Sequence, residues 1–146
     1  MSHVVPYLRL TAEGAQASMA AMIAKATEMN TPMCIAIVDD GGNLLAFARM
    51  DGAKLLSIDS AIAKARTAAS MRVQSGGTPE AVAMKLSLAT QGKFTNLNAG
   101  LPIIVEGHTI GGVGTGSGSG EQDLEVSKVG IAAIKGAKTF NDAKAF

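Results

Sequence analysis

The sequence predicts one α/β (α+β) domain in which two β-hairpins build an antiparallel sheet and helices pack against it. Two observations lead to this class. Short apolar runs rich in β-branched residues occur in pairs around turn residues, and the segments between them have helical spacing. The resulting order, α-ββ-α-α-ββ-α, favours an antiparallel sheet over a doubly wound parallel one. The length of 146 residues suits a single domain over residues 1–146.

The first half of the chain is predicted to contain two helices with a hairpin between them. In order, these elements are a helix at 11–30, strands at 33–38 and 44–49, and a helix from Ser57 to about Arg72. Thr11 can cap the first helix with its side chain, and Asn30 and Pro32 end it. The residues from Asp39 to Asn43 have the composition of a hairpin turn.

The second half repeats the pattern of helix, hairpin and helix. Its predicted elements are a helix that starts at Thr78-Pro79-Glu80 and runs to about Thr90, a loop at 91–100, strands at 101–105 and from Thr109, and a helix from Glu121 to about Lys138. Thr78 is expected to cap the first of these helices, with Pro79 at its first position. The residues 106–108 form the hairpin turn, and the tail 141–146 is expected to fray.

Charge and composition exclude several classes of protein. The net charge is +1 with only 17% charged residues, so the basic stripe that nucleic-acid binding needs is missing. No apolar run approaches the roughly 20 residues that span a bilayer, and the N-terminus does not resemble a signal peptide. We therefore expect a cytoplasmic protein. Because so few surface charges accompany Ala-rich helices, we also expect a homo-oligomer, dimeric or larger.

The most distinctive local pattern is a glycine passage near the second hairpin. Five glycines alternate with other residues at Gly112, Gly114, Gly116, Gly118 and Gly120. If this segment is extended, all five lie on one face that has no side chains. Two alternatives follow: a flat ligand lies on that face, or a helix packs closely against it. A phosphate site is not expected, because Glu121 and Asp123 occupy the next helix start.

Lys64 is the main candidate for chemistry. It lies between alanines, which could desolvate its ammonium and lower its pKa, as catalytic lysines require. Alternatively it extends from a packed helix and pairs with Glu121 or Asp123, and we predict that these charges approach one another. Asp59 is five residues from Lys64 and so lies on another face of the helix.

The sequence contains few metal-ligating residues. Cys34 begins a buried strand and is interpreted as a core residue, and only two histidines are present, so no metal cluster is expected. His108, in the second hairpin turn, could serve as a single axial ligand to haem or simply be exposed.

Three stretches together resemble the GlcG/HbpS-like family. They are Val38–Gly52 with its Asp-Asp-Gly-Gly-Asn core, Ser57–Ala68, and Gly111–Asp123. Their order and spacing cover roughly residues 8–138, almost the whole chain. The family includes haem-binding proteins and the C-terminal domain of propanediol-utilisation adenosyltransferases.

The resemblance implies a profilin-like fold, homo-oligomers and, in some members, binding of haem or a related tetrapyrrole. We therefore expect a small ligand-binding or accessory protein, with haem or a corrinoid as its ligand and a link to glycolate or diol metabolism. Expected ligand-binding residues are His108 and the segment Gly114, Thr115, Gly116 and Ser117. The alternative is a small enzyme acting on a carbonyl or carboxylic metabolite in a pocket between subunits, using Lys64 with Asp59, Glu121 or Asp123.

Overall fold

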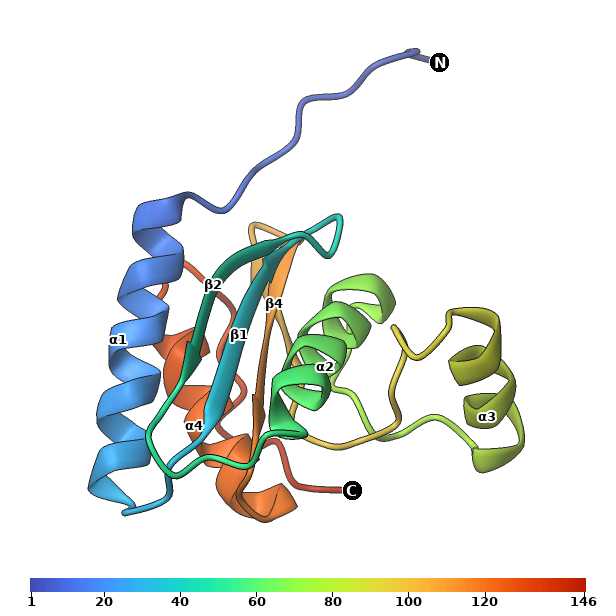
Figure 1. Ribbon diagram of the computed structural model, residues 1–146. Helices are drawn as coiled ribbons and strands as arrows, with labels where there is room; N and C mark the ends of the chain where they lie inside the picture. The colour runs from blue at the N-terminus through green and yellow to red at the C-terminus, as the bar shows by residue number, and fades with distance from the viewer.

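The computed structural model describes all residues from Met1 to Phe146 and has the predicted order of elements. These are α1 (Ala12–Glu28), β1 (Cys34–Asp39), β2 (Leu44–Arg49), α2 (Ser57–Met71), α3 (Glu80–Ala89), β3 (Leu101–Val105), β4 (His108–Gly116) and α4 (Gly120–Ala132). The four strands form one antiparallel sheet in the order β2-β1-β4-β3. The two predicted hairpins are therefore joined through pairing of β1 with β4, and the antiparallel α+β class is confirmed (Figure 1).

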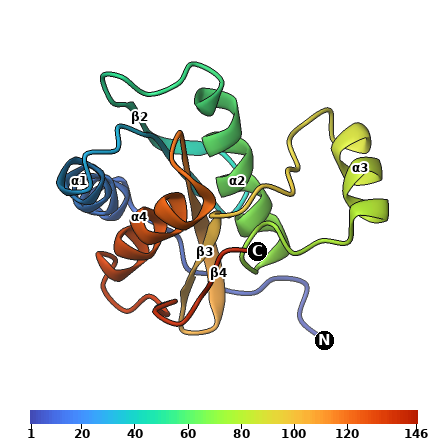
Figure 2. The same cartoon turned by 90° about the horizontal axis from the view of Figure 1, so that it is seen from below.

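Helices cover both faces of the sheet. Helices α1 and α4 lie side by side on one face, and α2 lies on the other (Figures 1 and 2). Strand β1 is buried on both sides because its residues alternate between the two layers. Ile35 and Ile37 join the larger core under α1 and α4, whereas Ala36 and Val38 face α2. The core against α2 consists mainly of alanines, which lets this helix approach the sheet closely.

The helix ends agree with the sequence in part. The Thr11 side chain accepts a hydrogen bond from the backbone N–H of Gly14 at 3.0 Å, so the predicted cap of α1 is confirmed. Thr78, however, does not cap α3: Pro79 holds that position without a side-chain bond, and the Thr78 N–H donates to Asn96. The cap of α4 is Ser119, which forms a reciprocal capping box with Gln122.

Two predictions for the C-terminal segment were wrong. Helix α4 ends at Ala132 instead of Lys138, and Gly136, with a φ of +83°, lies in the turn that follows. The tail is also held in place instead of fraying. Its Lys144 carbonyl accepts a hydrogen bond from Gln74 at 2.9 Å, and Phe146 packs against Gly77.

Helix α3 stands apart from the rest of the fold (Figure 2). Ala83 is its only buried residue, and Val82, Met84 and Leu88 are exposed apolar side chains. This helix therefore has an apolar surface that no other part of the chain covers. No helix of the structure combines the length and apolar character needed to cross a membrane.

Candidate functional site

The glycine face of β4 is covered by α2. A Cβ atom on Gly114 would lie 2.6 Å from the backbone nitrogen of Ala65 and would collide with the carbonyl oxygen of Ala61. Equivalent collisions with α2 arise at Gly112, and at Gly116 a Cβ would lie 3.0 Å from Ser60 Oγ. The alternative of close helix packing therefore describes this face.

The glycine face is also shorter than the five alternating glycines suggested. Strand β4 ends at Gly116, and Ser117 has a φ of +94°, so the chain turns away before Gly118 and Gly120. The Ser117 hydroxyl donates to Ser57 Oγ at 2.7 Å and accepts from the Lys54 N–H at 2.9 Å. The expected ligand contacts at the end of β4 are thus engaged in bonds within the chain.

Thr115 lies on the opposite side of β4 and is completely buried. Its hydroxyl donates to the Asp123 carbonyl at 2.7 Å and lies 3.0 Å from Ser127 Oγ. These contacts join the end of β4 to the first turns of α4.

Lys64 and Asp123 form a buried ion pair between α2 and α4. The Lys64 ammonium lies 3.0 Å from Asp123 Oδ2 and also donates to the Thr115 carbonyl at 2.7 Å. The predicted approach of these charges is confirmed for Asp123. Glu121 and Asp59 are both exposed and form no ion pair, so neither joins Lys64. Neither of the two main cavities is lined by the Lys64–Asp123 pair.

Opposing effects act on the pKa of the Asp123 carboxyl. Burial raises the pKa of this carboxyl, and the raising effect outweighs the lowering by the Lys64 ammonium and the Gly118 N–H. The Gly118 N–H donates to Oδ1 at 2.9 Å, so the carboxylate also fixes the turn before α4. Every buried polar side-chain atom has a hydrogen-bond partner. The arrangement is therefore that of a closed internal network.

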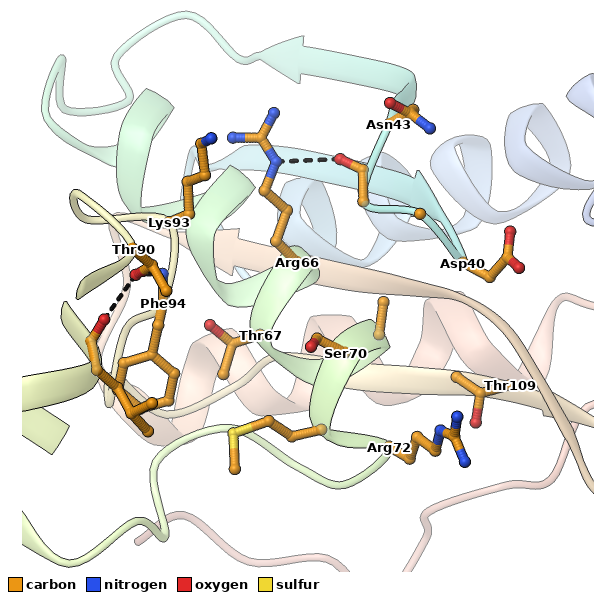
Figure 3. Close-up of a pocket in the computed structure, with 15 residues that line it drawn as sticks. Asp40, Asn43, Arg66, Thr67, Ser70, Arg72, Thr90, Lys93, Phe94 and Thr109 are labelled. Carbon is orange, nitrogen blue, oxygen red and sulfur yellow. Dashed lines mark hydrogen bonds between the residues drawn. The ribbon is translucent and has the colours of Figure 1, made fainter. Parts of the chain in front are cut away.

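A cleft of about 720 Å³ lies on the α2 side of the sheet. Figure 3 shows it between α2, the β1–β2 turn and the segment that follows α3. Its lining residues are Asp40, Gly41, Gly42, Asn43, Arg66, Thr67, Ala69, Ser70, Met71, Arg72, Leu86, Thr90, Lys93, Phe94 and Thr109. We call this cavity the α2 cleft.

The α2 cleft has a surplus of positive charge. Arg66, Arg72 and Lys93 line it, against the single carboxylate of Asp40, and none of the four takes part in an ion pair. Arg66 and Lys93 extend in the same direction at one end, while Arg72 and Asp40 lie toward the other (Figure 3). For a chain with a net charge of only +1, this is a local concentration of cations.

Apolar groups lie beside these charges. Phe94 is buried, Leu86 is half-buried, and Met71 presents an exposed thioether. The cleft can therefore accept a ligand that is apolar in one part and anionic in another. Sequence reasoning missed these residues because they come from four distant segments and form no spaced motif. The only signal in the sequence for any of these residues was that Arg66 lies in Ser57–Ala68, one of the three stretches that carry the family resemblance.

His108 borders a second, smaller cavity of about 200 Å³. It is exposed at the first position of β4, one residue before the predicted strand start, and follows the two-residue turn of Glu106 and Gly107. This cavity shares Asp40, Arg72 and Thr109 with the α2 cleft, so the two are adjacent. No group of three or more metal-ligating His, Cys, Asp or Glu residues occurs in the structure.

Known proteins resemble this chain over most of its length. An uncharacterised 15.0 kDa protein of the dhaT-dhaS intergenic region in Citrobacter freundii is 37% identical over 84% of the chain and 89% of its own length. The corrinoid adenosyltransferase PduO of the same organism is 35% identical over 78% of the chain, which spans only 36% of PduO.

Solved structures match as well. A structure described as a PduOC:heme complex superimposes with a TM-score of 0.82 at 29% identity, covering 90% of this chain and 99% of the other. The family model described as "Haem degrading protein HbpS-like" matches residues 10–132. Because that match spans well over half of the sequence, the chain belongs to the HbpS-like family.

Proposed function

We propose that this protein binds a tetrapyrrole, with haem as the leading ligand, and that the α2 cleft is the binding site. The observation that carries the proposal is a cleft of about 720 Å³ in which three cations adjoin a buried aromatic ring. The family description and the haem complex of a structural relative support haem as the first ligand to test.

The residues of the cleft fit the chemistry of haem. Haem is a flat, largely apolar ring with carboxylate side chains at one edge, and Phe94 and Leu86 provide apolar contact while Arg66 and Lys93 provide cations. Haem iron accepts imidazole or thioether ligands, and bound haem would supply that iron centre. Met71 lines the cleft itself and His108 borders the adjoining cavity, so these are the candidate ligands.

Titration with hemin tests this proposal. We expect a saturable shift of the Soret band at a defined ratio of hemin to protein. His108→Ala should change the position of the bound Soret band if the imidazole is a ligand. His3→Ala is the matched control, because His3 is the only other histidine and lies in the exposed N-terminal segment. Non-saturating absorbance changes, equal to those of an unrelated protein, would refute haem binding.

We further propose that the protein self-associates through α3. The exposed side chains of Val82, Met84 and Leu88 on this isolated helix favour burial against a second copy. Light scattering should give at least twice the chain mass of 14.8 kDa. Met84→Lys with Leu88→Lys should lower that mass, whereas Val4→Lys, also exposed but outside α3, should not. A wild-type particle with the mass of one chain would contradict self-association.

A further inference from the structure

We propose that Arg66 and Lys93 bind the carboxylate groups of the ligand, so that the α2 cleft selects an acidic porphyrin over a corrinoid whose side chains end in amides. This inference rests on the proposed function and adds to it the chemical basis of ligand choice. The shared chemistry is a pair of carboxylates, which a porphyrin or a small free dicarboxylate can present.

Arg66 is held in place with most of its donors unused. Its Nε donates to the Gly42 carbonyl at 3.0 Å, and its aliphatic stem packs against Gly42. The four other guanidinium N–H groups have no acceptor within the chain. The nearby carboxylate of Asp39 instead accepts hydrogen bonds from Gly41 and Asn43 within the turn. A fixed guanidinium with free N–H groups is suited to bidentate binding of a carboxylate.

Lys93 is positioned beside Arg66 by its neighbours in the chain. The Thr95 N–H donates to Thr67 Oγ1 on α2 at 2.9 Å, and the Phe94 N–H donates to Thr90 Oγ1 at 3.0 Å. The first bond attaches the segment to α2 at the residue that follows Arg66, and the second joins the buried Phe94 to the end of α3. Lys93 itself is exposed and has no ion-pair partner. Two unpaired cations thus meet at one end of the cleft (Figure 3).

Charge decides between the ligand classes. A carboxylate forms charge-assisted hydrogen bonds with these side chains that are about twice as strong as those formed by a neutral amide. Asp40 is the only acidic residue that lines the cleft, and it lies toward Arg72 at the other end (Figure 3). The apolar side chains of Phe94 and Leu86 lie next to these cations. A porphyrin ring can pack against them, whereas a small dicarboxylate has no apolar group that could do so.

The experiment combines a change in the ligand with a change in the protein. Hemin is compared with its dimethyl ester, which lacks free carboxylates, and with cyanocobinamide, whose side chains end in amides. Each is titrated into wild-type protein, Arg66→Gln/Lys93→Gln, and the control Arg9→Gln/Lys135→Gln. The control pair removes the same two charges at exposed positions outside the cleft. Thermal melts establish that each variant is folded, and Lys93→Gln alone serves if Arg66→Gln unfolds the protein.

We expect wild type and control to bind hemin roughly tenfold or more tightly than either the ester or cobinamide. In the Arg66→Gln/Lys93→Gln variant this preference should fall below about threefold, with the affinity for the ester unchanged. Equal wild-type affinity for hemin and ester, or a variant that weakens hemin and ester alike, would overturn the inference while leaving haem binding intact.

A final arm separates this inference from the proposed function. Succinate, a dicarboxylate without a ring, is titrated against wild type and variant by calorimetry. If hemin fails to bind but succinate binds in a manner that depends on Arg66 and Lys93, the carboxylate site is supported and the tetrapyrrole function is refuted. If neither binds, both are refuted.

Discussion

The Lys64 ammonium of α2 lies 3.0 Å from Asp123 Oδ2 of α4, and both side chains are about 95% buried, with exposed fractions of 6% and 5%. The two helices lie on opposite faces of the sheet, so this ion pair connects its two layers (Figure 1). Asp123 also holds the turn before α4 through the Gly118 N–H. The pair therefore fixes the relative position of three parts of the fold.

Removing one partner of this pair should destabilise the protein strongly. In Asp123→Asn the amide NH2 must face either the Lys64 ammonium or the Gly118 N–H, both of which are donors, so one buried donor loses its acceptor at a cost of about 1–3 kcal/mol. Lys64→Met combined with Asp123→Asn removes both charges, so its cost should be well below the sum of the single changes. Urea unfolding of the wild type, Lys64→Met, Asp123→Asn and the double variant measures the coupling between the two residues.

The ion pair of Lys128 with Glu125 is the matched control for this cycle. Its N–O distance is 3.3 Å, but the Glu125 side chain is 55% exposed, so water screens the interaction. The corresponding cycle with Lys128→Met and Glu125→Gln should give a coupling below about 0.5 kcal/mol. Equal couplings at both sites would show that burial does not strengthen the Lys64–Asp123 pair.

Asp123 should also make stability depend on pH. Burial raises its pKa above the ordinary value of 3.8, so the folded chain binds this proton more tightly than the unfolded chain. The resulting stabilisation is fully present below 3.8 and is lost as the pH rises through the folded pKa. The free energy of unfolding of the wild type relative to Asp123→Asn should therefore fall with rising pH, and then level off.

Urea unfolding at successive pH values from the acid range to about pH 7 measures this difference. Subtracting the free energy of unfolding of Asp123→Asn from that of the wild type at each pH removes the contribution of the other carboxyls, because they titrate in both proteins. A difference that instead rises with pH would mean that the Lys64 ammonium, and not burial, dominates the pKa of Asp123.

Local patterns predicted the fold well because hairpins and caps depend on neighbouring residues. The strand at Leu44–Arg49 and the one at Leu101–Val105 have the predicted bounds, and Thr11 caps α1 as expected. Predictions failed where distant residues decide the structure. The tail is bonded to a distant residue, because the Lys144 carbonyl accepts a hydrogen bond from Gln74, and no pattern near Lys144 indicates this contact.

The candidate site could be predicted only in fragments for the same reason. Arg66 and Lys93 come from α2 and from the segment after α3, and only folding brings them together. The glycine passage left two alternatives open because a missing side chain makes room equally for a ligand or for a helix. Only the position of α2 distinguishes these alternatives.

Cys34 should react slowly with thiol reagents in the native protein. Burial raises the pKa of its thiol more than the nearby charge of Arg49 lowers it, so little of the reactive thiolate is present at neutral pH. The side chain is also inaccessible on β1. We expect the release of thionitrobenzoate from Ellman's reagent to be slow in buffer and rapid in unfolding concentrations of urea. Equally fast reaction in both conditions would contradict the burial of Cys34.

Two glycines of the same passage should respond in opposite ways to alanine. Gly114 lies against the backbone of α2, where a Cβ would be 2.6 Å from Ala65 N, and backbone atoms cannot rotate away as a side chain would. Gly114→Ala should therefore cost about 3 kcal/mol, the upper end of the usual range for overpacking.

Gly120 provides the matched control, because it begins α4 and a Cβ there would meet no atom closer than 3.5 Å. Alanine also has a higher helix propensity than glycine, so Gly120→Ala should leave stability unchanged within about 0.5 kcal/mol or raise it slightly. Urea unfolding of both variants measures the difference. If Gly114→Ala is tolerated as well as Gly120→Ala, α2 does not press on β4 in the way the structure shows, and the glycine face would be open to a ligand after all.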